Sequence, residues 1–465
     1  MESQRSDHTE LTPDDAHPSV GIADSYIHSV EESLQEDNTI SLEDQLKSLS
    51  PSDCADLIQK LSDEDRKDLI ENCRQFIKPE TYAELDHAVQ RSVLSSLPSP
   101  QVASIVSELD SDDALDLIIN LEESFQQDVI RHLSAKTRVA LEEGMSFPED
   151  SAGRLMQREY VAVPQFWTVG KTIDYIRAAR DELPSDFFDV MIIDPMYHIQ
   201  GEIPLNKLVR AKREEKIADL SLESSHSIPA DMDQEEVARI FQRENLGSAP
   251  VVDTDNRLIG VITIDDIIDV ITEEAEEDIL KLAGVADSDL YSAVFSTSAR
   301  RFRWLFVNLL TAILASIVIS FFDTTIEDVV ALAILMPIVA SMGGNAGTQA
   351  LTVAVRALAT KELSQANMFR VIWKETLVGL LNGLGFAILA GLVAALWFSN
   401  MVLGFVIALA MVINLVVAGI FGAGIPIFLE RCGSDPALSS TVFLTTVTDV
   451  VGFFGFLGLA SIFLL

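Results

Sequence analysis

The sequence predicts a multidomain protein in which an α-helical N-terminal domain precedes two tandem α/β modules, a connecting helix and an all-α membrane domain of five helices. Three observations predict this order. A helical pattern repeats early in the chain, strand and helix patterns alternate twice between residues 147 and 277, and long apolar stretches follow residue 303. The length of 465 residues is sufficient for about three domains.

The charge of the chain is concentrated before residue 300. The formal net charge is -38, and residues 300–465 contribute nothing to it because they hold 8 basic and 8 acidic side chains. The first 299 residues therefore contain 25 Lys and Arg against 63 Asp and Glu. This excess of acid argues against nucleic acid and anionic lipid as partners, since both bind through Lys and Arg. It is compatible with cation binding, or simply with solubility.

The beginning of the chain and the cysteines indicate a cytosolic N-terminal part. Residues 1–38 are polar and acidic and contain no apolar segment typical of a signal peptide, so we expect this stretch to be disordered. Cys54, Cys73 and Cys432 form no pair with the spacing of a zinc site, which suits a reducing compartment.

Residues 39–146 have the pattern of a helical domain. The stretch Leu61–Ile70 recurs as Leu109–Ile118, 48 residues later, which predicts a stack of short helix pairs resembling an α-solenoid. Acidic residues fall at the helix starts, where the helix dipole favours them, so capping explains most of them. Metal binding by Asp112, Asp113 or Asp116 is the alternative.

The next two segments, 147–217 and 218–277, each read as a β-α-β-β-α unit. The second unit is marked by Pro250-Val251-Val252-Asp253 and by Gly260-Val261-Ile262-Thr263-Ile264-Asp265-Asp266. These units resemble a pair of cystathionine-β-synthase (CBS) domains, which are regulatory modules. The resemblance implies an adenine-nucleotide site in which Asp266, three residues after Thr263, faces a ribose. The first unit lacks the corresponding Thr-x-x-Asp after Gly201.

A run of acidic residues follows the second unit. Asp266, Asp269, Glu273, Glu276 and Glu277 recur at three- and four-residue spacings, so they share one helix face, where like charges repel. Bound Mg²⁺ or Ca²⁺ would relieve this repulsion, because both ions prefer carboxylate oxygens. A solvated acidic face is the alternative.

Residues 278–303 are expected to form an amphipathic connecting helix with a break at Gly284, and Arg300 to Trp304 mark a membrane boundary. The domain 304–465 contains five apolar stretches long enough to cross a bilayer. They are Trp304–Phe322, Val329–Leu358, Val371–Phe398, Met401–Leu429 and Leu438–Leu465. Basic residues follow the second stretch and acidic ones follow the first, which places the N-terminus in the cytosol and the C-terminus outside a cell membrane crossed several times.

Two features inside these stretches are unusual for a lipid-facing helix. Between Met336 and Ala350, Pro337 removes a backbone donor and three glycines weaken helix continuity, so this backbone must be buried or line a wet cavity. Asp449 has apolar sequence on both sides, and a central carboxylate costs about 2.5–3.5 kcal/mol on insertion scales. A cation site explains Asp449, and a structural hydrogen bond or a protonated acid is the alternative. Asn345 and Asn414 fit either a polar lining or helix packing.

The chain resembles the MgtE-type magnesium channels and transporters from about Ile40 to Leu465. The segments that carry the resemblance are Gly343-Gly344-Asn345-Ala346-Gly347-Thr348-Gln349, Arg356-Ala357-Leu358-Ala359, Asp435-Pro436-Ala437-Leu438, Thr445-Thr446-Val447-Thr448-Asp449-Val450-Val451-Gly452, Glu149 to Met156 and Asp233 to Arg239. The family implies a homodimer with a superhelical N domain, a CBS pair, a connecting plug helix and five membrane helices per chain.

The resemblance also implies two sets of site residues. The expected pore residues are Asp449, Asn345, Gly343, Gly344 and Ala346. The expected cytosolic Mg²⁺ sensor consists of Asp266, Asp269, Glu274, Glu277, Asp278, Glu235 and Asp113. In one respect the chain departs from the family pattern, because Asn245 stands where an acid often precedes the Pro-Val-Val-Asp stretch.

These observations predict a non-enzymatic protein that imports Mg²⁺ and closes when cytosolic Mg²⁺ bridges its acidic domains, because the ion binds one state preferentially. The first alternative is a broader divalent transporter for Co²⁺ or Mn²⁺, although the membrane stretches hold none of the His ligands that softer ions favour. The second is a CBS-regulated protein of another transport class, such as an anion channel, against which Asp449 argues. An intramembrane aspartyl protease would need two central carboxylates, and only Asp449 is central.

Overall fold

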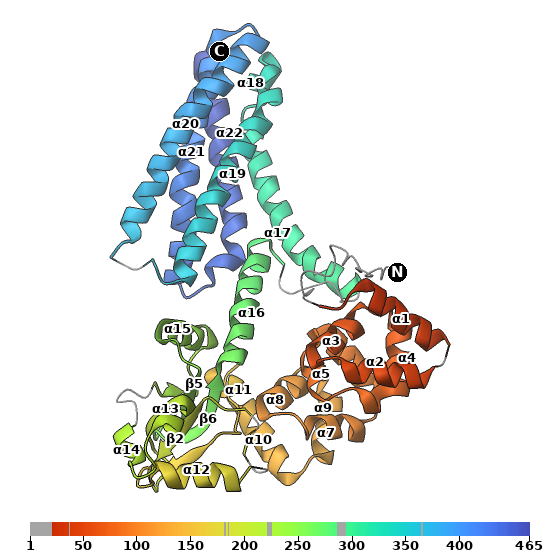
Figure 1. Cartoon of the computed structure of the whole chain (residues 1–465). Helices are drawn as coiled ribbons and strands as arrows, with labels where there is room; N and C mark the ends of the chain where they lie inside the picture. Colours follow the sequence, from red (N-terminus) through yellow and green to blue (C-terminus); the bar gives the residue numbers. More distant parts are fainter. Residues whose placement is uncertain are drawn as a thin grey trace, which may run out of the picture. The chain divides into compact units, whose positions relative to one another are not determined.

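The structure is a computed structural model that describes residues 21–36, 38–180, 183–184, 186–220, 226–285, 294–363 and 366–465. The chain divides into two compact units, Met1–Thr272 and Glu273–Leu465. Figure 1 labels the helices and strands of each unit.

Short helices with a common apolar core form the N domain. Serine side chains cap several of them: Ser50 accepts a hydrogen bond from the Asp53 amide and Ser62 from the Asp65 amide. Leu57, Leu94 and Leu117 are fully buried in the core. The helices are α1 (Asp24–Gln35), α2 (Thr39–Ser48), α3 (Pro51–Lys60), α4 (Asp63–Cys73), α5 (Glu80–Ala83), α6 (His87–Ser96), α7 (Ser99–Val106), α8 (Ser111–Ile119), α9 (Glu123–His132) and α10 (Ala135–Ser146), with a 3-10 turn η2 (Arg74–Phe76).

Helix α1 lies within residues 1–38, for which the sequence analysis expects disorder, so that expectation is wrong for Asp24–Gln35. Val30 is fully buried, and Ile27 and Leu34 pack on the same core. These apolar residues recur at helical spacing among acidic ones, so the high average polarity conceals one apolar face. The part of the expectation that concerns residues 1–20 lies outside the described residues.

The two α/β modules have the same topology. In the first, β1 (Ala162–Pro164) pairs parallel with β2 (Asp189–Ile193), and β2 pairs antiparallel with β3 (Ile199–Pro204). In the second, β4 (Ile228–Pro229), β5 (Ser248–Val252) and β6 (Leu258–Thr263) repeat that arrangement. The helices of the modules are α12 (Val169–Ala178), α13 (Leu205–Arg210), α14 (Ile217–Leu220) and α15 (Gln234–Glu244). The predicted pair of CBS modules is therefore confirmed.

The segment that follows the N domain packs with the second module, although it precedes the first in sequence. Helix α11 (Ala152–Leu155) and Met156 lie in the core of the second module with Val237 and Phe241. The Gln157 amide donates to the Val261 carbonyl at 2.9 Å, and the Val261 amide donates back at the same distance. From the sequence, residues 147–156 are expected to belong to the first module, whereas Phe147, Ala152, Leu155 and Met156 pack in the core of the second.

Helix α16 (Ile264–Leu282) begins directly after β6 and carries most of the acidic run. Gly284 has a φ of +73°, a left-handed conformation that favours glycine and ends the helix near the expected break. Of the expected connecting segment 278–303, residues 286–293 lie outside the described residues. Its last part, from Val294, is the beginning of α17 (Val294–Ser320).

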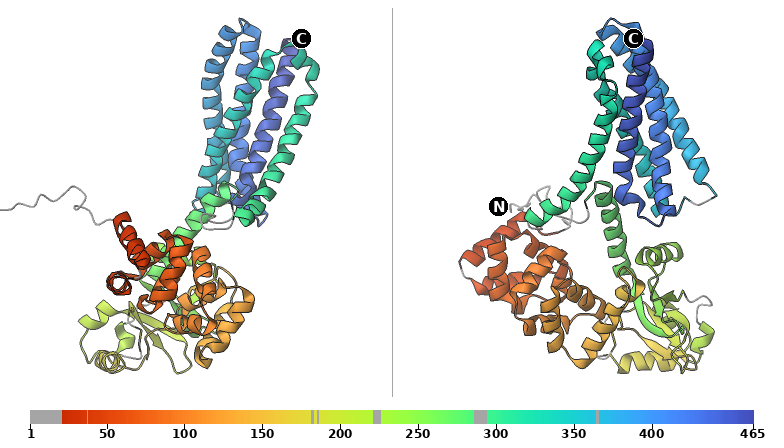
Figure 2. Two further views of the ribbon diagram at one scale, coloured as in Figure 1. Left: turned by 90° about the vertical axis from the view of Figure 1, so that its right-hand side faces the viewer. Right: turned by 180° about the vertical axis from the view of Figure 1, so that it is seen from behind.

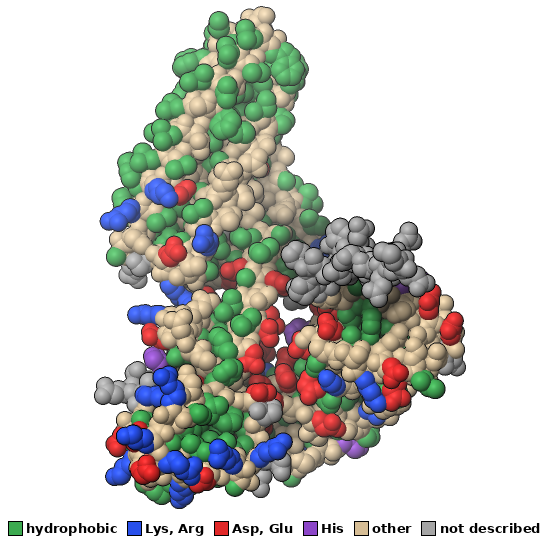
Figure 3. All heavy atoms as spheres, in the orientation of Figure 1, with side chains coloured by type: hydrophobic (Ala, Val, Ile, Leu, Met, Phe, Trp, Pro, Cys, Tyr) green, Lys and Arg blue, Asp and Glu red, His purple; other side chains and the backbone are tan. Residues whose placement is uncertain are grey.

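Among the residues that the structure describes, five helices of the second unit are long and apolar enough to span a membrane, which confirms the predicted five-helix domain. Helix α21 (Met401–Arg431) is the central one and packs against α19 (Ala331–Ala359), α20 (Met368–Trp397) and α22 (Pro436–Phe463). Both views in Figure 2 show these helices side by side. A short helix, α18 (Asp323–Asp328), precedes α19. Hydrophobic side chains are spread over the visible face of the bundle in Figure 3, and the few charged ones lie toward its lower end.

Helix α19 is continuous across Pro337 and the glycines, whereas the sequence analysis expects weakened continuity there. One missing donor removes a single bond from a helix of 29 residues, so its cost is local. The glycines are used for close packing: a side chain at Gly343 would overlap the Asn414 amide, and one at Gly347 would lie 2.8 Å from the Leu444 side chain. These close contacts stabilise the helix that the glycines would otherwise weaken.

Candidate functional site

Asp449 lies in the middle of α22, with apolar residues on both sides, and its side chain is half-buried. Within the described part of the chain, no hydrogen bond or ion pair reaches its carboxylate. For the alternative of a structural hydrogen bond, the described residues therefore provide the Asp449 carboxylate with no partner. A carboxylate at this depth requires compensation, because the hydrocarbon region offers no hydrogen bonds.

Asn414 of α21 joins three membrane helices. It is fully buried, and its Nδ2 donates a 2.7 Å hydrogen bond to the Val339 carbonyl of α19. Gly343 of α19 and Gly452 of α22 both lie against the Asn414 amide, where neither could carry a side chain without displacing it. Of the two roles considered for Asn414, the structure supports helix packing.

The glycine contacts place Asp449 at the depth of the residues between Gly343 and Gly347. Gly347 touches Leu444, and Gly343 shares the Asn414 amide with Gly452, so α19 and α22 run past each other in opposite directions. Asp449 lies between Leu444 and Gly452, at the depth of the segment 344–346.

The predicted pore residues of α19 differ in exposure. Gly343 is buried at the contact with α21, whereas the position of a side chain at Gly344 is open space. Asn345 is exposed and Ala346 is half-buried. Gly344 and Asn345 are therefore the α19 residues that one chain leaves accessible near the depth of Asp449.

A second group of carboxylates gathers in the unit Met1–Thr272, where α8 of the N domain faces the start of α16. Burial raises the pKa of Asp113 to about 7, and the charges of Asp266 and Asp110 add to this effect. Burial and then the charge of Asp266 likewise raise the pKa of Asp112 well above its usual range. The structure thus brings two of the predicted sensor residues, Asp113 and Asp266, into one electrostatic cluster, and Figure 3 shows acidic side chains crowded in this region.

Asp266 also forms a local hydrogen bond with Thr263, the last residue of β6 in the second module. Its Oδ2 accepts from the Thr263 hydroxyl at 2.7 Å, which lowers its pKa, but burial has the larger effect and raises the pKa to about 6. Asp269 is exposed, and its charge adds to burial in raising the pKa of Glu84. The expected nucleotide-facing pair, Thr263 and Asp266, is thus hydrogen-bonded internally in this structure.

The remaining predicted sensor residues lie on other surfaces. Glu235 is at the start of α15, 3.9 Å from Arg239. Glu274, Glu277 and Asp278 lie further along α16, in the unit that begins at Glu273, and there Glu277 binds Lys281 at 2.5 Å.

Capping is the expected explanation for most acids at the helix starts, with metal binding by Asp112, Asp113 or Asp116 as the alternative. At the start of α8 the structure favours the alternative over a cap by Asp110. The Asp110 side chain makes no cap, and the Glu159 carboxylate takes that role by accepting a 3.2 Å hydrogen bond from the Ser111 amide. Asp110, Asp112 and Glu84 therefore belong to the acidic cluster with Asp113. The available signal was the presence of three acids within the four residues Asp110–Asp113, more than a cap needs.

The carboxylates are not arranged as a finished metal site. Among the described residues, no three His, Cys, Asp or Glu side chains are close enough together to hold a metal ion. Closely spaced carboxylates with raised pKa values repel one another when ionised, so a divalent cation or protons would stabilise the cluster.

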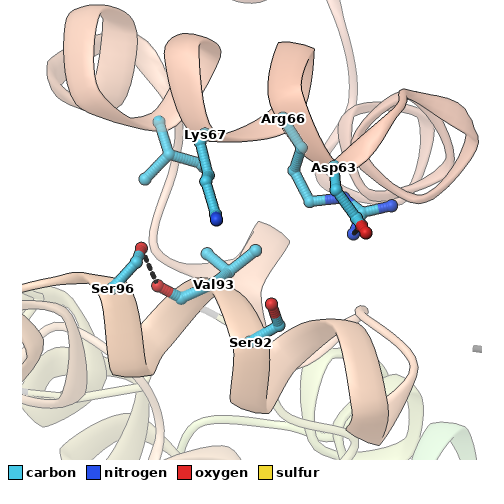
Figure 4. A pocket seen from close by; sticks show the side chains of 7 residues that line it. Asp63, Arg66, Lys67, Ser92, Val93 and Ser96 are labelled. Atoms are coloured by element: carbon cyan, nitrogen blue, oxygen red, sulfur yellow. Dashed lines mark hydrogen bonds and ion pairs between the residues drawn. The ribbon is translucent and has the colours of Figure 1, made fainter. Parts of the chain in front are cut away.

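A small cavity of about 90 Å³ in the N domain lies apart from these carboxylates, between α4 and α6. Figure 4 shows Lys67 and Arg66 on one side and Ser92 and Ser96 on the other. The Arg66 guanidinium is already bound, to Asp63 and to the carbonyls of three residues near the end of α3: Ile58, Gln59 and Leu61. This arginine therefore closes a helix end, and the cavity is a feature of N-domain packing.

Comparison with known proteins covers both units. The MgtE family model, described as a divalent cation transporter, matches residues 336–459. The model of the MgtE intracellular N domain matches residues 49–150, and the CBS domain model matches residues 217–273.

Individual relatives agree with these matches. The chain is 34% identical over 321 residues to the magnesium transporter MgtE of Bacillus subtilis, and the aligned residues cover 69% of this chain and 71% of that protein. It is 35% identical over 336 residues to the magnesium transporter MgtE of Thermus thermophilus, and the aligned residues cover 71% of this chain and 74% of that protein. Among solved structures, the cytosolic domain of the Mg²⁺ channel MgtE in complex with ATP is 29% identical to this chain, with a TM-score of 0.49. The match covers 52% of this chain and 99% of the chain in that structure. With a CBS pair, five membrane-length helices and relatives of this similarity, the chain belongs to the MgtE family of magnesium transporters.

Proposed function

We propose that this chain imports Mg²⁺ across the cell membrane along a pathway that passes Asp449, and that cytosolic Mg²⁺ closes it. The observation that carries the proposal is the half-buried carboxylate of Asp449, which no described residue neutralises or hydrogen-bonds. Mg²⁺ prefers oxygen ligands and keeps most of its water, so one carboxylate beside small residues suits a hydrated ion. Gly344, Asn345 and Ala346 provide such residues near the same depth.

The pathway is proposed to be shared by two copies of the chain. One protomer leaves Asp449 half-exposed on its bundle. Facing lipid would cost this carboxylate about 2.5–3.5 kcal/mol on insertion scales, and a second copy around a wet pore would remove that cost. In this arrangement the N-terminus is cytosolic and the C-terminus is outside, because Arg356, Lys361 and Arg370 flank the connection between α19 and α20.

The acidic cluster on α8 and α16 is proposed to act as the cytosolic sensor, with Asp113, Asp266 and Asp269 in one unit and Glu274, Glu277 and Asp278 further along α16. Glu235 on α15 would add an outer ligand. Mg²⁺ would favour the state in which these carboxylates are close together, because it binds that state more tightly. An adenine nucleotide at the CBS pair would have to compete with the hydrogen bond between Thr263 and Asp266.

The pathway is tested by Mg²⁺ uptake into proteoliposomes that contain a Mg²⁺-sensitive dye. Asp449→Asn keeps the size of the side chain and removes its charge, so we expect uptake to fall at least about ten-fold, equivalent to 1.4 kcal/mol. The matched control is Asp323→Asn, which removes an acid from α18 of the same domain and should leave uptake unchanged.

Uptake that persists in Asp449→Asn would contradict the pathway. The same liposomes distinguish the broader alternative, since comparable uptake of Mn²⁺ or Co²⁺ by the unmodified chain would identify a general divalent transporter.

A further inference from the structure

The end of α16 is bound to the start of α22 through the ammonium group of Lys281. Its Nζ lies 2.5 Å from Glu277 Oε1 and 2.9 Å from Asp435 Oδ2. The other oxygen of Asp435 accepts a 2.8 Å hydrogen bond from the Ala437 amide and thereby caps α22. One ammonium group thus joins a carboxylate of the acidic helix to the carboxylate that begins the helix of Asp449.

Two further contacts attach the same end of α16 to the membrane helices. The Thr441 hydroxyl of α22 donates a 3.0 Å hydrogen bond to the Leu282 carbonyl. The Leu282 side chain packs on a cluster that includes Leu351 of α19 and Leu444 of α22. These are the two helices that carry the proposed pathway residues, and Leu444 precedes Asp449 by little more than one turn.

The surroundings of Lys281 make this ion pair stronger than one at the open surface. The side chains of Lys281 and Asp435 are 23% and 33% exposed, so water screens their attraction only partly. Burial alone would lower the pKa of Lys281, but the hydrogen bonds and charges of Glu277 and Asp435 outweigh it and raise the pKa above its usual value. Lys281 therefore remains charged throughout the physiological pH range.

We propose that Lys281 is a positioning residue that holds the end of α16 against α19 and α22 by bridging Glu277 and Asp435. This role rests on the proposed function, in which the acidic cluster is the sensor and Asp449 lies on the pathway. A cation fixed to the chain attracts both carboxylates at any Mg²⁺ concentration. With the state in which α16 contacts α19 and α22 taken as the closed one, the pair of Lys281 and Asp435 adds a constant contribution to that state, and bound Mg²⁺ adds the variable one.

This division predicts different effects for the two kinds of residue. Loss of a sensor carboxylate weakens the response to Mg²⁺ itself. Loss of the Lys281 bridge leaves the response intact but moves it to a higher Mg²⁺ concentration, because the closed state has lost its constant contribution.

The experiment measures Mg²⁺ uptake by the full chain in proteoliposomes over a range of Mg²⁺ concentrations on the cytosolic side. Lys281→Gln and Asp435→Asn should each raise the concentration for half-closure about five-fold, the low end of typical couplings between sites. Asparagine can still cap α22, so Asp435→Asn isolates the charge. The double variant should shift no further than either single one.

Two controls separate positioning from general stability. Lys281→Arg keeps the charge and should retain most of the wild-type half-closure concentration. Arg431→Gln removes an exposed basic residue at the nearby end of α21 and should have no effect. An unchanged half-closure concentration in Lys281→Gln would overturn the proposal, while normal wild-type uptake and closure would still support the proposed function.

A second measurement does not depend on transport. A carbodiimide condenses an amine with an adjacent carboxylate, so treatment of the intact protein should yield a Lys281–Asp435 cross-linked peptide in mass spectrometry. Absence of this peptide, when other Lys–carboxylate pairs such as Lys47–Glu43 at 2.5 Å are cross-linked, would overturn the bridge. Absence of Mg²⁺ uptake by the wild-type chain, with the cross-link present, would instead overturn the proposed function.

Discussion

Binding of Mg²⁺ to the acidic cluster on α8 and α16 should release protons near neutral pH. The reason is that burial raises the pKa of Asp113 to about 7 and that of Asp266 to about 6, from an ordinary value of 3.8. Carboxylates must be deprotonated to bind a metal, so Mg²⁺ competes with the protons that these groups retain.

The expected number of protons follows from these pKa values. At pH 6 Asp113 is mostly and Asp266 half protonated, so these two groups together should release about one and a half protons on binding. The release should fall to about half a proton at pH 7 and to about a tenth at pH 8.

The same groups determine how stability depends on pH without Mg²⁺. Between the ordinary pKa of 3.8 and the raised value of about 7, the folded chain retains protons that the unfolded chain has lost. The free energy of unfolding therefore falls as the pH rises through this window and is lowest above it. Added Mg²⁺ should recover that stability at pH 8 and have little effect at pH 5.

The release is measured by titrating Mg²⁺ into the metal-free, full-length protein in detergent, in weakly buffered solution with a pH indicator. Asp113→Asn should remove most of the release at pH 7, whereas Asp63→Asn, outside the cluster in the same domain, should not change it. A release that is equal at pH 6 and pH 8, or that is unaffected by Asp113→Asn, would refute the assignment of the cluster as a Mg²⁺ site.

Two further predictions concern packing and buried charge. Gly343→Ala should destabilise the membrane domain by about 1–3 kcal/mol in thermal unfolding in detergent, because its methyl group overlaps Asn414, whereas Gly344→Ala enters open space and should be neutral. Equal melting temperatures for the two would show that the glycine contact is not tight. Burial and then the charge of Asp189 raise the pKa of Glu202 to about 7, so wild-type stability should fall between pH 5 and pH 8. Glu202→Gln should remove about 2 kcal/mol of that fall, and an unchanged pH dependence of unfolding in this variant would argue against a raised pKa of Glu202.

Local patterns in the sequence were sufficient to predict the elements of this fold. The membrane stretches are recognisable because about 20 apolar residues leave few alternatives to a spanning helix. The second CBS module is recognisable because Pro250 to Asp253 and Gly260 to Asp266 fix the strand ends and the following helix. In both cases the signal lies within a few consecutive turns or strands.

Contacts between distant segments could not be predicted from such local patterns. Met156 belongs to the core of a module whose first strand begins 72 residues later, and no local pattern encodes that. The same applies to Asp113 and Asp266, which only the family resemblance placed in one site, because each looks locally like an ordinary acid near a helix start. Lys281 was not singled out, because its role depends on Asp435, far along the chain.

The glycine-rich part of α19 shows why one sequence pattern is compatible with two structures. By propensity alone, each glycine costs about 1 kcal/mol relative to alanine, which favours an interrupted helix. In the bundle, the side chains of Asn414 and Leu444 pack directly against Gly343 and Gly347, so packing explains why these two positions are glycine. Gly344 is different, because a side chain there would meet nothing. Packing therefore leaves Gly344 unexplained, and its position beside Asn345, near the depth of Asp449, is where we expect the ion to pass.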